Sequence, residues 1–167
     1  YQRAVLLLEE TLFGPRELES AEFEFNFTSY YEATMGPRLK RRFATFQRLA
    51  DPGQLAAWKL ASNALEERVA REVDWPGRPA RVVNLDVGYL TGAKLVLAST
   101  KDFAHRLYLR DGIYAEITLN FKKQGWQAHP CTFPDYASPT YHPFLSQARD
   151  RHLRRSKEGA GVETGNA

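Results

Sequence analysis

The spacing of apolar residues divides the chain into segments of helical and of strand character. Over residues 1–13 apolar side chains recur at helical spacing, and a Gly-Pro pair then stops the helix. Phe23, Phe25 and Phe27 alternate with polar residues, which is typical of a half-buried strand. A second strand is predicted over 41–48 after a Gly-Pro turn.

The middle of the chain begins with a strong helix-start signal. Asp51 can cap a helix and Pro52 suits its first turn, so the pattern predicts a helix over 51–73. A strand is predicted over 81–87, followed by a turn and a short helix over 92–101.

A hairpin is predicted around a three-residue loop, Arg110–Gly112, in which Gly112 is left-handed and Leu109 lies opposite Ile113. This register separates the two faces of the hairpin, whereas a shift by one residue would mix them. The face expected to cover the core holds His105, Leu107, Leu109, Ile113, Ala115, Ile117 and Leu119. The opposite, polar face holds Arg106, Tyr108, Tyr114, Glu116 and Thr118.

The remaining segments are a third strand over 126–129 and a helix over 141–155. Residues 156–167 are small and polar and are expected to be disordered. The order of elements indicates a single α+β domain over 1–155. We expect a mainly antiparallel sheet with helices packed on one face, in the ferredoxin-like manner.

Composition narrows the class of protein. The 167 residues are 43% hydrophobic and 26% charged, which is ordinary globular usage, and no apolar run is long enough to span a membrane. Cys131 is the single cysteine and the chain opens without a signal-peptide pattern, so a cytoplasmic location is expected. The net charge of +3 owes much to basic residues in 149–157.

Several motifs are specific enough to suggest a family. They are Phe27–Glu32, Met35-Gly36, Leu39–Phe43, Asn84–Leu90 with Lys94–Ala98, Thr100–Asp102 and Asp111–Glu116. In these motifs the chain resembles the bacterial family called "domain of unknown function 4416", some members of which are labelled GTP-binding. At Val87 the family more usually carries proline. The resemblance extends to about Arg149 and implies no mechanism.

A GTP-binding P-loop is not present in the sequence. Such a loop needs four residues between two glycines, followed at once by Lys and then Ser or Thr. The nearest segment, Gly88–Leu95, has three residues between its glycines, and Ala93 precedes Lys94. Leu95 stands where the hydroxyl group is required.

The same segment nevertheless suggests an anion site. If a strand ends near Val87 and a helix follows, the backbone N–H groups at the helix start could hold a phosphate or carboxylate. The residues expected to form this strand-to-helix turn are Asp86, Gly88, Thr91, Gly92 and Lys94, with Arg106, Tyr108 and Glu116 as a wall. The leading hypothesis is therefore a binding protein, or an enzyme of unknown reaction, for a small phosphorylated or nucleotide-like ligand. A structural Asp86–Lys94 pair is the alternative.

Two other functions remain open. The aromatic sheet face and the basic C-terminal helix could bind RNA. Alternatively, the chain is a structural domain that forms a homodimer through Tyr108 and Tyr114. Asp86 and Glu116 could hold Mg²⁺ if their strands adjoin, although the scattered histidines give no metal-binding motif.

Overall fold

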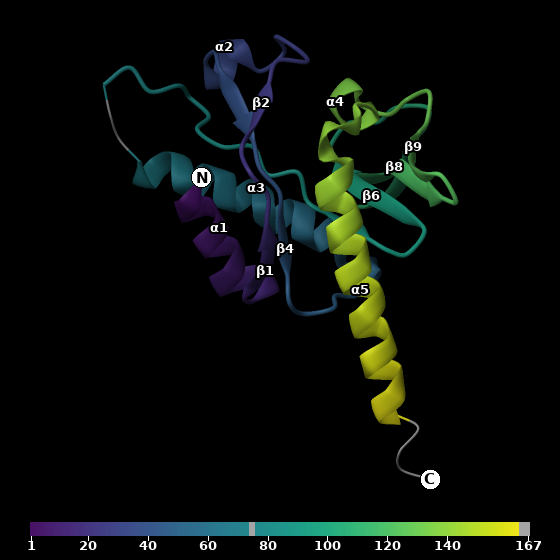
Figure 1. Ribbon diagram of the computed structural model, residues 1–167. Helices are drawn as coiled ribbons and strands as arrows, with labels where there is room; N and C mark the ends of the chain where they lie inside the picture. The colour runs from purple at the N-terminus through teal and green to yellow at the C-terminus, as the bar shows by residue number, and fades with distance from the viewer. Residues whose placement is uncertain (74–75, 164–167) are drawn as a thin grey trace. The chain divides into compact units, whose positions relative to one another are not determined.

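The computed structural model describes residues 1–73 and 76–163, with side chains up to residue 158 (Figure 1). The chain divides into two compact units. Unit 1 comprises Tyr1–Val87 and Ala98–Ala115, and unit 2 comprises Gly88–Leu97 and Glu116–Ala167. The sequence-based prediction of a single domain remains a prediction, and each unit is described by itself below.

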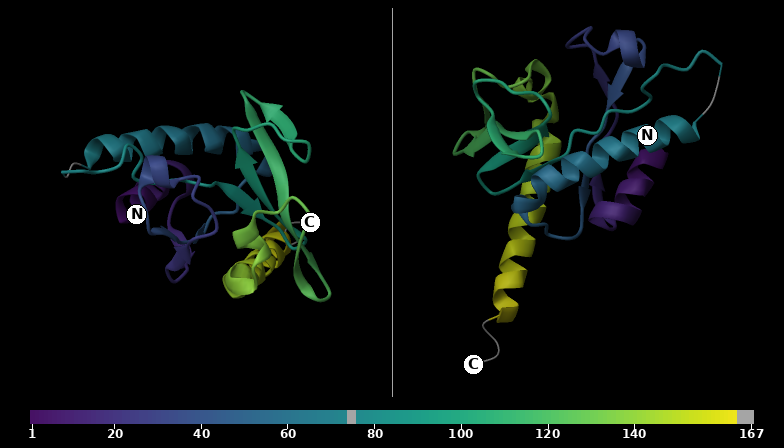
Figure 2. Two further views of the ribbon diagram at one scale, coloured as in Figure 1. Left: turned by 90° about the horizontal axis from the view of Figure 1, so that it is seen from above. Right: turned by 180° about the vertical axis from the view of Figure 1, so that it is seen from behind.

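The core of unit 1 lies between two helices that run side by side, α1 (Gln2–Leu8) and α3 (Leu55–Glu72) (Figure 2). Ala4, Leu7 and Leu8 of α1 form one buried cluster with Leu65 and Val69 of α3. The predicted first helix is confirmed, but its last turn is a π-helix, η1 (Glu9–Phe13).

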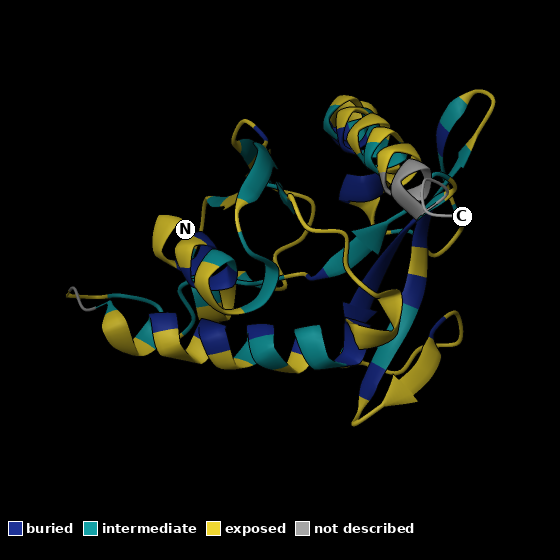
Figure 3. Ribbon diagram, turned by 90° about the horizontal axis from the view of Figure 1, so that it is seen from below, coloured by how far each residue is buried: buried dark blue, intermediate teal, exposed yellow. Residues whose placement is uncertain are grey.

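The predicted helix over 51–73 is also confirmed. The Asp51 carboxylate accepts a hydrogen bond of 2.9 Å from the backbone N–H of Gly53, so Asp51 caps the short helix η2 (Pro52–Gln54) that leads into α3. Buried and exposed positions alternate along α3 (Figure 3).

Two small antiparallel sheets complete the first half of unit 1. β2 (Phe23–Phe25) pairs with β3 (Leu39–Arg41), which confirms the predicted strand of alternating phenylalanines. The second predicted strand is two strands, because β4 (Ala44–Phe46) leaves β3 and pairs with β1 (Arg16–Glu19). β1 was not predicted, and the helix α2 (Glu32–Met35) lies between β2 and β3.

The strand predicted over 81–87 is absent from the structure, although this segment lies within the described residues. Leu85 of this segment instead exchanges hydrogen bonds with side chains of α3. The alternation of apolar and polar residues in 81–87 indicated an extended segment. Its backbone at Leu85 forms hydrogen bonds with side chains of α3 instead of with a neighbouring strand.

The helix predicted over 92–101 is wrong. Unit 2 has a β-hairpin there, in which β5 (Gly88–Leu90) pairs antiparallel with β6 (Lys94–Ser99). The apolar run Leu95–Ala98 is buried along its whole length. A short continuous apolar run fits a buried strand as well as a helix, which explains the error.

The register predicted for the second hairpin is confirmed over most of its length. β7 (Leu107–Arg110) pairs with β8 (Ile113–Lys122), with Leu107 opposite Ala115 and Tyr108 opposite Tyr114. Near the turn the register shifts, so that Arg110 rather than Leu109 lies opposite Ile113. Asp111 and Gly112 both have positive φ, 53° and 74°, which makes a two-residue turn.

The predicted division of this hairpin into a core face and a polar face is confirmed only in part, since Ile113 and Leu119 are buried and Tyr108 is exposed as expected. Arg106, Glu116 and Thr118 of the supposedly polar face are buried, whereas Leu107 is 75% exposed and Ile117 48% exposed. Alternation identifies which residues share a face, but it does not say which face the rest of the protein covers.

Unit 2 ends with a strand and helices. β9 (Gly125–Ala128) pairs antiparallel with β8, which confirms the predicted third strand. The segment then forms α4 (Pro134–Ala137), η3 (Pro139–Tyr141) and the long helix α5 (His142–Glu163). This helix continues beyond Arg155 into the part that was expected to be disordered, and residues 164–167 lie outside the described residues.

Within the part of the chain that the structure describes, the strands form three sheets rather than the single sheet that was predicted. The largest has the strand order β5-β6-β8-β7, with β9 also paired to β8. The α+β class with antiparallel sheets is confirmed, whereas a ferredoxin-like sheet does not describe the strand pairing.

Candidate functional site

The glycines of the predicted anion site, Gly88 and Gly92, are explained by packing within unit 2. A Cβ atom on Gly88 would lie 2.2 Å from the backbone oxygen of Val96 on the paired strand. A Cβ atom on Gly92 would lie 3.0 Å from a methyl group of Leu153 in α5. The space beside each glycine on its Cβ side is therefore filled by protein atoms.

Thr91 and Lys94, two further residues of the predicted turn, belong to the hairpin. The backbone N–H of Thr91 donates to the backbone oxygen of Lys94 at 2.9 Å, and the Thr91 hydroxyl accepts from Ala93 at 3.1 Å. Lys94 is the first residue of β6. The helix N-terminus that was expected to hold the anion is therefore missing, since Thr91 caps a turn between strands instead.

Arg106 is buried in unit 1 and supports the loop that precedes it. Its guanidinium donates to the Ser99 hydroxyl at 2.8 Å and to the backbone oxygen of Lys101 at 3.0 Å. It also lies 4.8 Å from the ring centre of Phe103. The predicted wall residue thus fixes the backbone of Lys101.

Tyr108 and Glu116, the other predicted wall residues, differ greatly in exposure. Tyr108 is 61% exposed and contacts Tyr114 edge to face, with ring centres 5.4 Å apart. Glu116 is buried and accepts a hydrogen bond of 3.2 Å from the Thr118 hydroxyl. The contacts within each unit do not test a Mg²⁺ site at Asp86 and Glu116, which remains a prediction.

Asp86 is the predicted site residue around which other candidate groups gather. Its carboxylate lies 3.5 Å from the guanidinium of Arg41, whose side chain is 15% exposed. Arg41 also lies over the ring of Phe25, 4.8 Å from its centre. β3 therefore brings a shielded cation to the segment 81–87.

The segment that carries Asp86 is held by a buried polar clamp on α3. Glu66, 8% exposed, accepts hydrogen bonds from the backbone N–H of Leu85 at 2.6 Å and from the guanidinium of Arg81. Lys59, 6% exposed, donates to the backbone oxygen of Leu85 at 2.8 Å. Asn84 accepts from Arg81 at 2.5 Å. Because these groups are shielded from water, they fix the backbone next to Asp86.

A second cation approaches from the loop after β6. The ammonium group of Lys101 donates to the phenol oxygen of Tyr30 at 2.7 Å and lies 4.1 Å from the ring centre. This hydrogen bond, together with the charges of Lys101 and Arg81, lowers the pKa of Tyr30 by favouring its anion. Lys101 thus has a neutral phenol, rather than a carboxylate, as the partner of its charge.

Tyr31 contacts both Tyr30, the partner of Lys101, and Phe25, the ring that lies under Arg41. Its ring contacts Tyr30 edge to face at 5.0 Å and lies 6.1 Å from Phe25. Burial, and after it the negative charge of Asp86, raises the pKa of Tyr31, while Arg41 and Arg81 oppose this change. The two neighbouring phenols therefore have pKa values shifted in opposite directions.

We call these residues the tyrosine–cation cluster: Tyr30, Tyr31, Arg41, Arg81, Asp86 and Lys101, all in unit 1. They come from four segments that are far apart in the sequence. Of the six, only Asp86 was predicted as a site residue. Most of the others lie in or beside the motifs that carry the family resemblance, which was the one sequence signal that could have indicated them.

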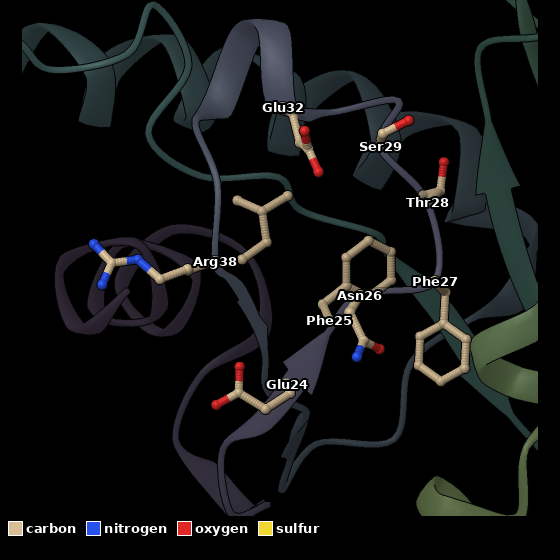
Figure 4. A pocket seen from close by; sticks show the side chains of 9 residues that line it. Glu24, Phe25, Asn26, Phe27, Thr28, Ser29, Glu32 and Arg38 are labelled. Atoms are coloured by element: carbon tan, nitrogen blue, oxygen red, sulfur yellow. The ribbon is translucent and has the colours of Figure 1, made fainter.

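A hollow of about 420 Å³ opens beside the cluster (Figure 4). Phe25 lies in its wall, and so do Thr28 and Ser29, which immediately precede Tyr30. The Thr28 hydroxyl accepts a hydrogen bond of 3.1 Å from the backbone N–H of Tyr30. The loop that lines the hollow therefore also positions the first tyrosine.

In residues 1–73 and 76–163, no three His, Cys, Asp or Glu residues gather in a way that could hold a metal ion. Within the same ranges, no helix combines the length and the apolar character needed to cross a bilayer.

Comparison with known proteins adds the family. Neither the curated proteins nor the solved structures contain a match to this chain. A family model described as "Domain of unknown function (DUF4416)" matches residues 2–152, which include every residue of the tyrosine–cation cluster and of the hollow. The chain therefore belongs to the family of domain of unknown function 4416.

Proposed function

We propose that this protein binds a small ligand through an anionic group, a phosphate or carboxylate, at the tyrosine–cation cluster. This keeps the class of ligand inferred from the sequence and moves its site from the hairpin at Gly88–Lys94 to unit 1. The main observation in support is that the Lys101 ammonium group has a neutral phenol, that of Tyr30, as its hydrogen-bond partner.

The charges in the cluster favour an anion. Three cations gather there: Arg41 contacts the carboxylate of Asp86, Arg81 contacts that of Glu66, and Lys101 donates to the phenol oxygen of Tyr30. Arginine and lysine side chains with a phenol are the donors that commonly bind phosphate and carboxylate groups in proteins.

The backbone segments that carry Lys101 and Asp86 are held by hydrogen bonds within the protein. Arg106 and Ser99 hold the backbone of Lys101, while Glu66 and Lys59 hold the segment next to Asp86. Donors that are already held lose little conformational freedom on binding, which favours affinity. A solvated group of surface charges would not need buried side chains to support it.

A thermal-shift experiment with inorganic phosphate, pyrophosphate and simple phosphate esters tests the proposal. A ligand at about 100 times its Kd stabilises the folded protein by about 2.7 kcal/mol, or several degrees in Tm. We expect a shift in the wild type that is lost in Lys101→Met. The matched control is Lys123→Met, at an exposed lysine in the turn after β8.

Two outcomes would contradict the proposal. One is the absence of any shift in a folded wild-type protein. The other is an equal shift in wild type and Lys101→Met, which would place the ligand elsewhere. RNA binding and homodimer formation are separate predictions, which these contacts within unit 1 do not address.

A further inference from the structure

We infer that the hollow beside the cluster takes a planar aromatic group that carries N–H donors, joined to the anionic group in one ligand. A nucleobase attached to a phosphate has this chemistry. The inference rests on the proposed function, because the cluster supplies the binding site for the anionic end.

The hollow and the cluster share a wall. Phe25 lines the hollow, and its ring also contacts the guanidinium of Arg41 and the ring of Tyr31. Phe27 follows β2 by two residues. Its ring centre lies 6.1 Å from that of Phe25, and the residue is 38% exposed. A ligand that fills the hollow therefore reaches the cluster across one aromatic ring.

The lining of the hollow suits a flat apolar group. Phe25, Phe27 and Leu39 provide apolar surface, and aromatic rings bind planar groups by stacking. Base stacking on an aromatic side chain is sequence-tolerant, since every base has a π-face.

The carboxylate of Glu32 favours a group with N–H donors. Glu32 lines the hollow together with Arg38 and with Glu24, whose carboxylate pairs with the ammonium group of Lys40. In Figure 4 the Glu32 carboxylate points into the hollow, whereas the Arg38 guanidinium points away from it. A carboxylate accepts hydrogen bonds and donates none, so it selects amino or ring N–H groups.

The two ends of the site therefore offer different groups. The Glu32 carboxylate points into the hollow, whereas Arg41, Arg81 and Lys101 lie at the cluster. A ligand with a neutral, donor-rich ring at one end and an anion at the other satisfies both, whereas inorganic phosphate satisfies only the cluster.

Calorimetric titration of the full chain separates the two ends. The probes are inorganic phosphate, ribose 5-phosphate and the four ribonucleoside 5′-monophosphates. We expect at least one nucleotide to bind about tenfold more tightly than ribose 5-phosphate, which is the scale of one stacked base. Phe27→Ala should remove this advantage and leave the affinity for ribose 5-phosphate unchanged.

Glu32→Gln is a second variant that does not depend on removing an aromatic side chain. It should weaken the preferred nucleotide by several-fold and not ribose 5-phosphate. Phe133→Ala, at a residue of similar exposure in unit 2, is the matched control and should bind like wild type. Circular dichroism and the Tm establish that each variant is folded.

The outcomes distinguish this inference from the proposed function. If nucleotides bind no more tightly than ribose 5-phosphate, the hollow does not take the ring, although the anion site stands. If a nucleotide advantage survives in both Phe27→Ala and Glu32→Gln, the ring binds elsewhere and the inference is overturned. If no probe binds to the folded protein, the anion site fails and the inference fails with it.

Discussion

The buried carboxylate of Glu66 is the residue on which the position of Asp86 depends most directly. It accepts hydrogen bonds from Leu85 and Arg81, and its side chain is 9% exposed. Removing one member of a buried, hydrogen-bonded pair leaves the other member without compensation. Because the Arg81 side chain is 35% exposed, water replaces part of the lost interaction.

We expect Glu66→Ala to lower the free energy of unfolding by about 2 kcal/mol, measured by urea denaturation. The next residue provides the control. Glu67 is 75% exposed and forms only a long contact of 3.9 Å with Arg71, so Glu67→Ala should change the free energy by less than about 0.5 kcal/mol. Equal effects of the two substitutions would show that the clamp contributes nothing to stability.

A second residue-scale prediction concerns acid. Hydrogen bonds from Arg3 and Arg68 lower the pKa of Glu72 to about 2. A carboxyl group with a depressed pKa stabilises the folded state above its ordinary pKa, and this contribution is lost as the pH falls toward the depressed value. The Tm of the wild type should therefore fall between about pH 4.5 and pH 2.

Glu72→Gln should flatten this part of the profile, because its amide does not titrate. Glu67→Gln, with its long ion pair, should leave the slope as it is in wild type. The measurement is the Tm of each protein over the acid range. A slope that is the same in all three proteins would contradict the assignment to Glu72.

The Tyr30–Lys101 pair predicts a titration that can be followed by tyrosinate absorbance. Lys101 favours the phenolate of Tyr30, so this tyrosine should ionise at lower pH than ordinary tyrosines. The early component should vanish in Tyr30→Phe and move to higher pH in Lys101→Met. It should be unchanged in Lys123→Met, and an early component that persists in Tyr30→Phe would belong to another tyrosine.

At the scale of elements, the β5–β6 hairpin gives the sharpest contrast between sequence and structure. A Cβ atom on Gly88 would meet a backbone oxygen, which cannot move without disturbing the strand pair. A Cβ atom on Gly92 would meet the end of the flexible Leu153 side chain. Gly88→Ala should therefore destabilise the protein by about 2 kcal/mol or more, and Gly92→Ala by less than about 1 kcal/mol.

Urea denaturation of the two variants measures this contrast. A Gly88→Ala protein as stable as wild type would show that the strands are not as close as described. The same pair of variants bears on the hypothesis drawn from the sequence, because a phosphate-binding turn needs both glycines for access, whereas strand packing makes Gly88 far less tolerant than Gly92.

The elements that sequence could predict were those with local signals. The capping residue Asp51 and the alternating phenylalanines from Phe23 each sit inside the element that they specify. The elements that were missed depend on distant partners. The segment around Leu85 extends against α3 and forms no ladder. Arg106, Glu116 and Thr118 are buried by parts of the chain that periodicity does not reveal.

The candidate site follows the same rule. Asp86 was predicted as part of a strand-to-helix turn, and the structure has a β-hairpin after it instead of a helix. Its partners Arg41 and Lys101 looked like ordinary surface charges, since nothing local distinguishes a shielded arginine from a solvated one. Only the family motifs pointed to the stretches that contain them.

At the scale of the whole molecule, the division into two units makes the location of ligand binding measurable. Every residue of the tyrosine–cation cluster and of the hollow belongs to unit 1, whereas the hairpin first predicted to bind the anion belongs to unit 2. Ligand binding suppresses local opening of the backbone segments that contact the ligand, and hydrogen exchange reports such opening. We expect a bound nucleoside monophosphate to slow amide exchange in residues 26–41, 81–86 and 99–106.

The amides of 88–97 should exchange at the same rate with and without the nucleotide, since Gly88 and Gly92 face protein atoms rather than open space. Lys101→Met provides the control, because it should abolish the protection in all three segments together while leaving the protein folded. Protection confined to 88–97 would restore the hairpin as the binding site and refute the tyrosine–cation cluster. Protection spread evenly over both units would mean that the nucleotide stabilises the protein globally, and Lys101→Met would then have to remove that effect for the cluster to remain its source.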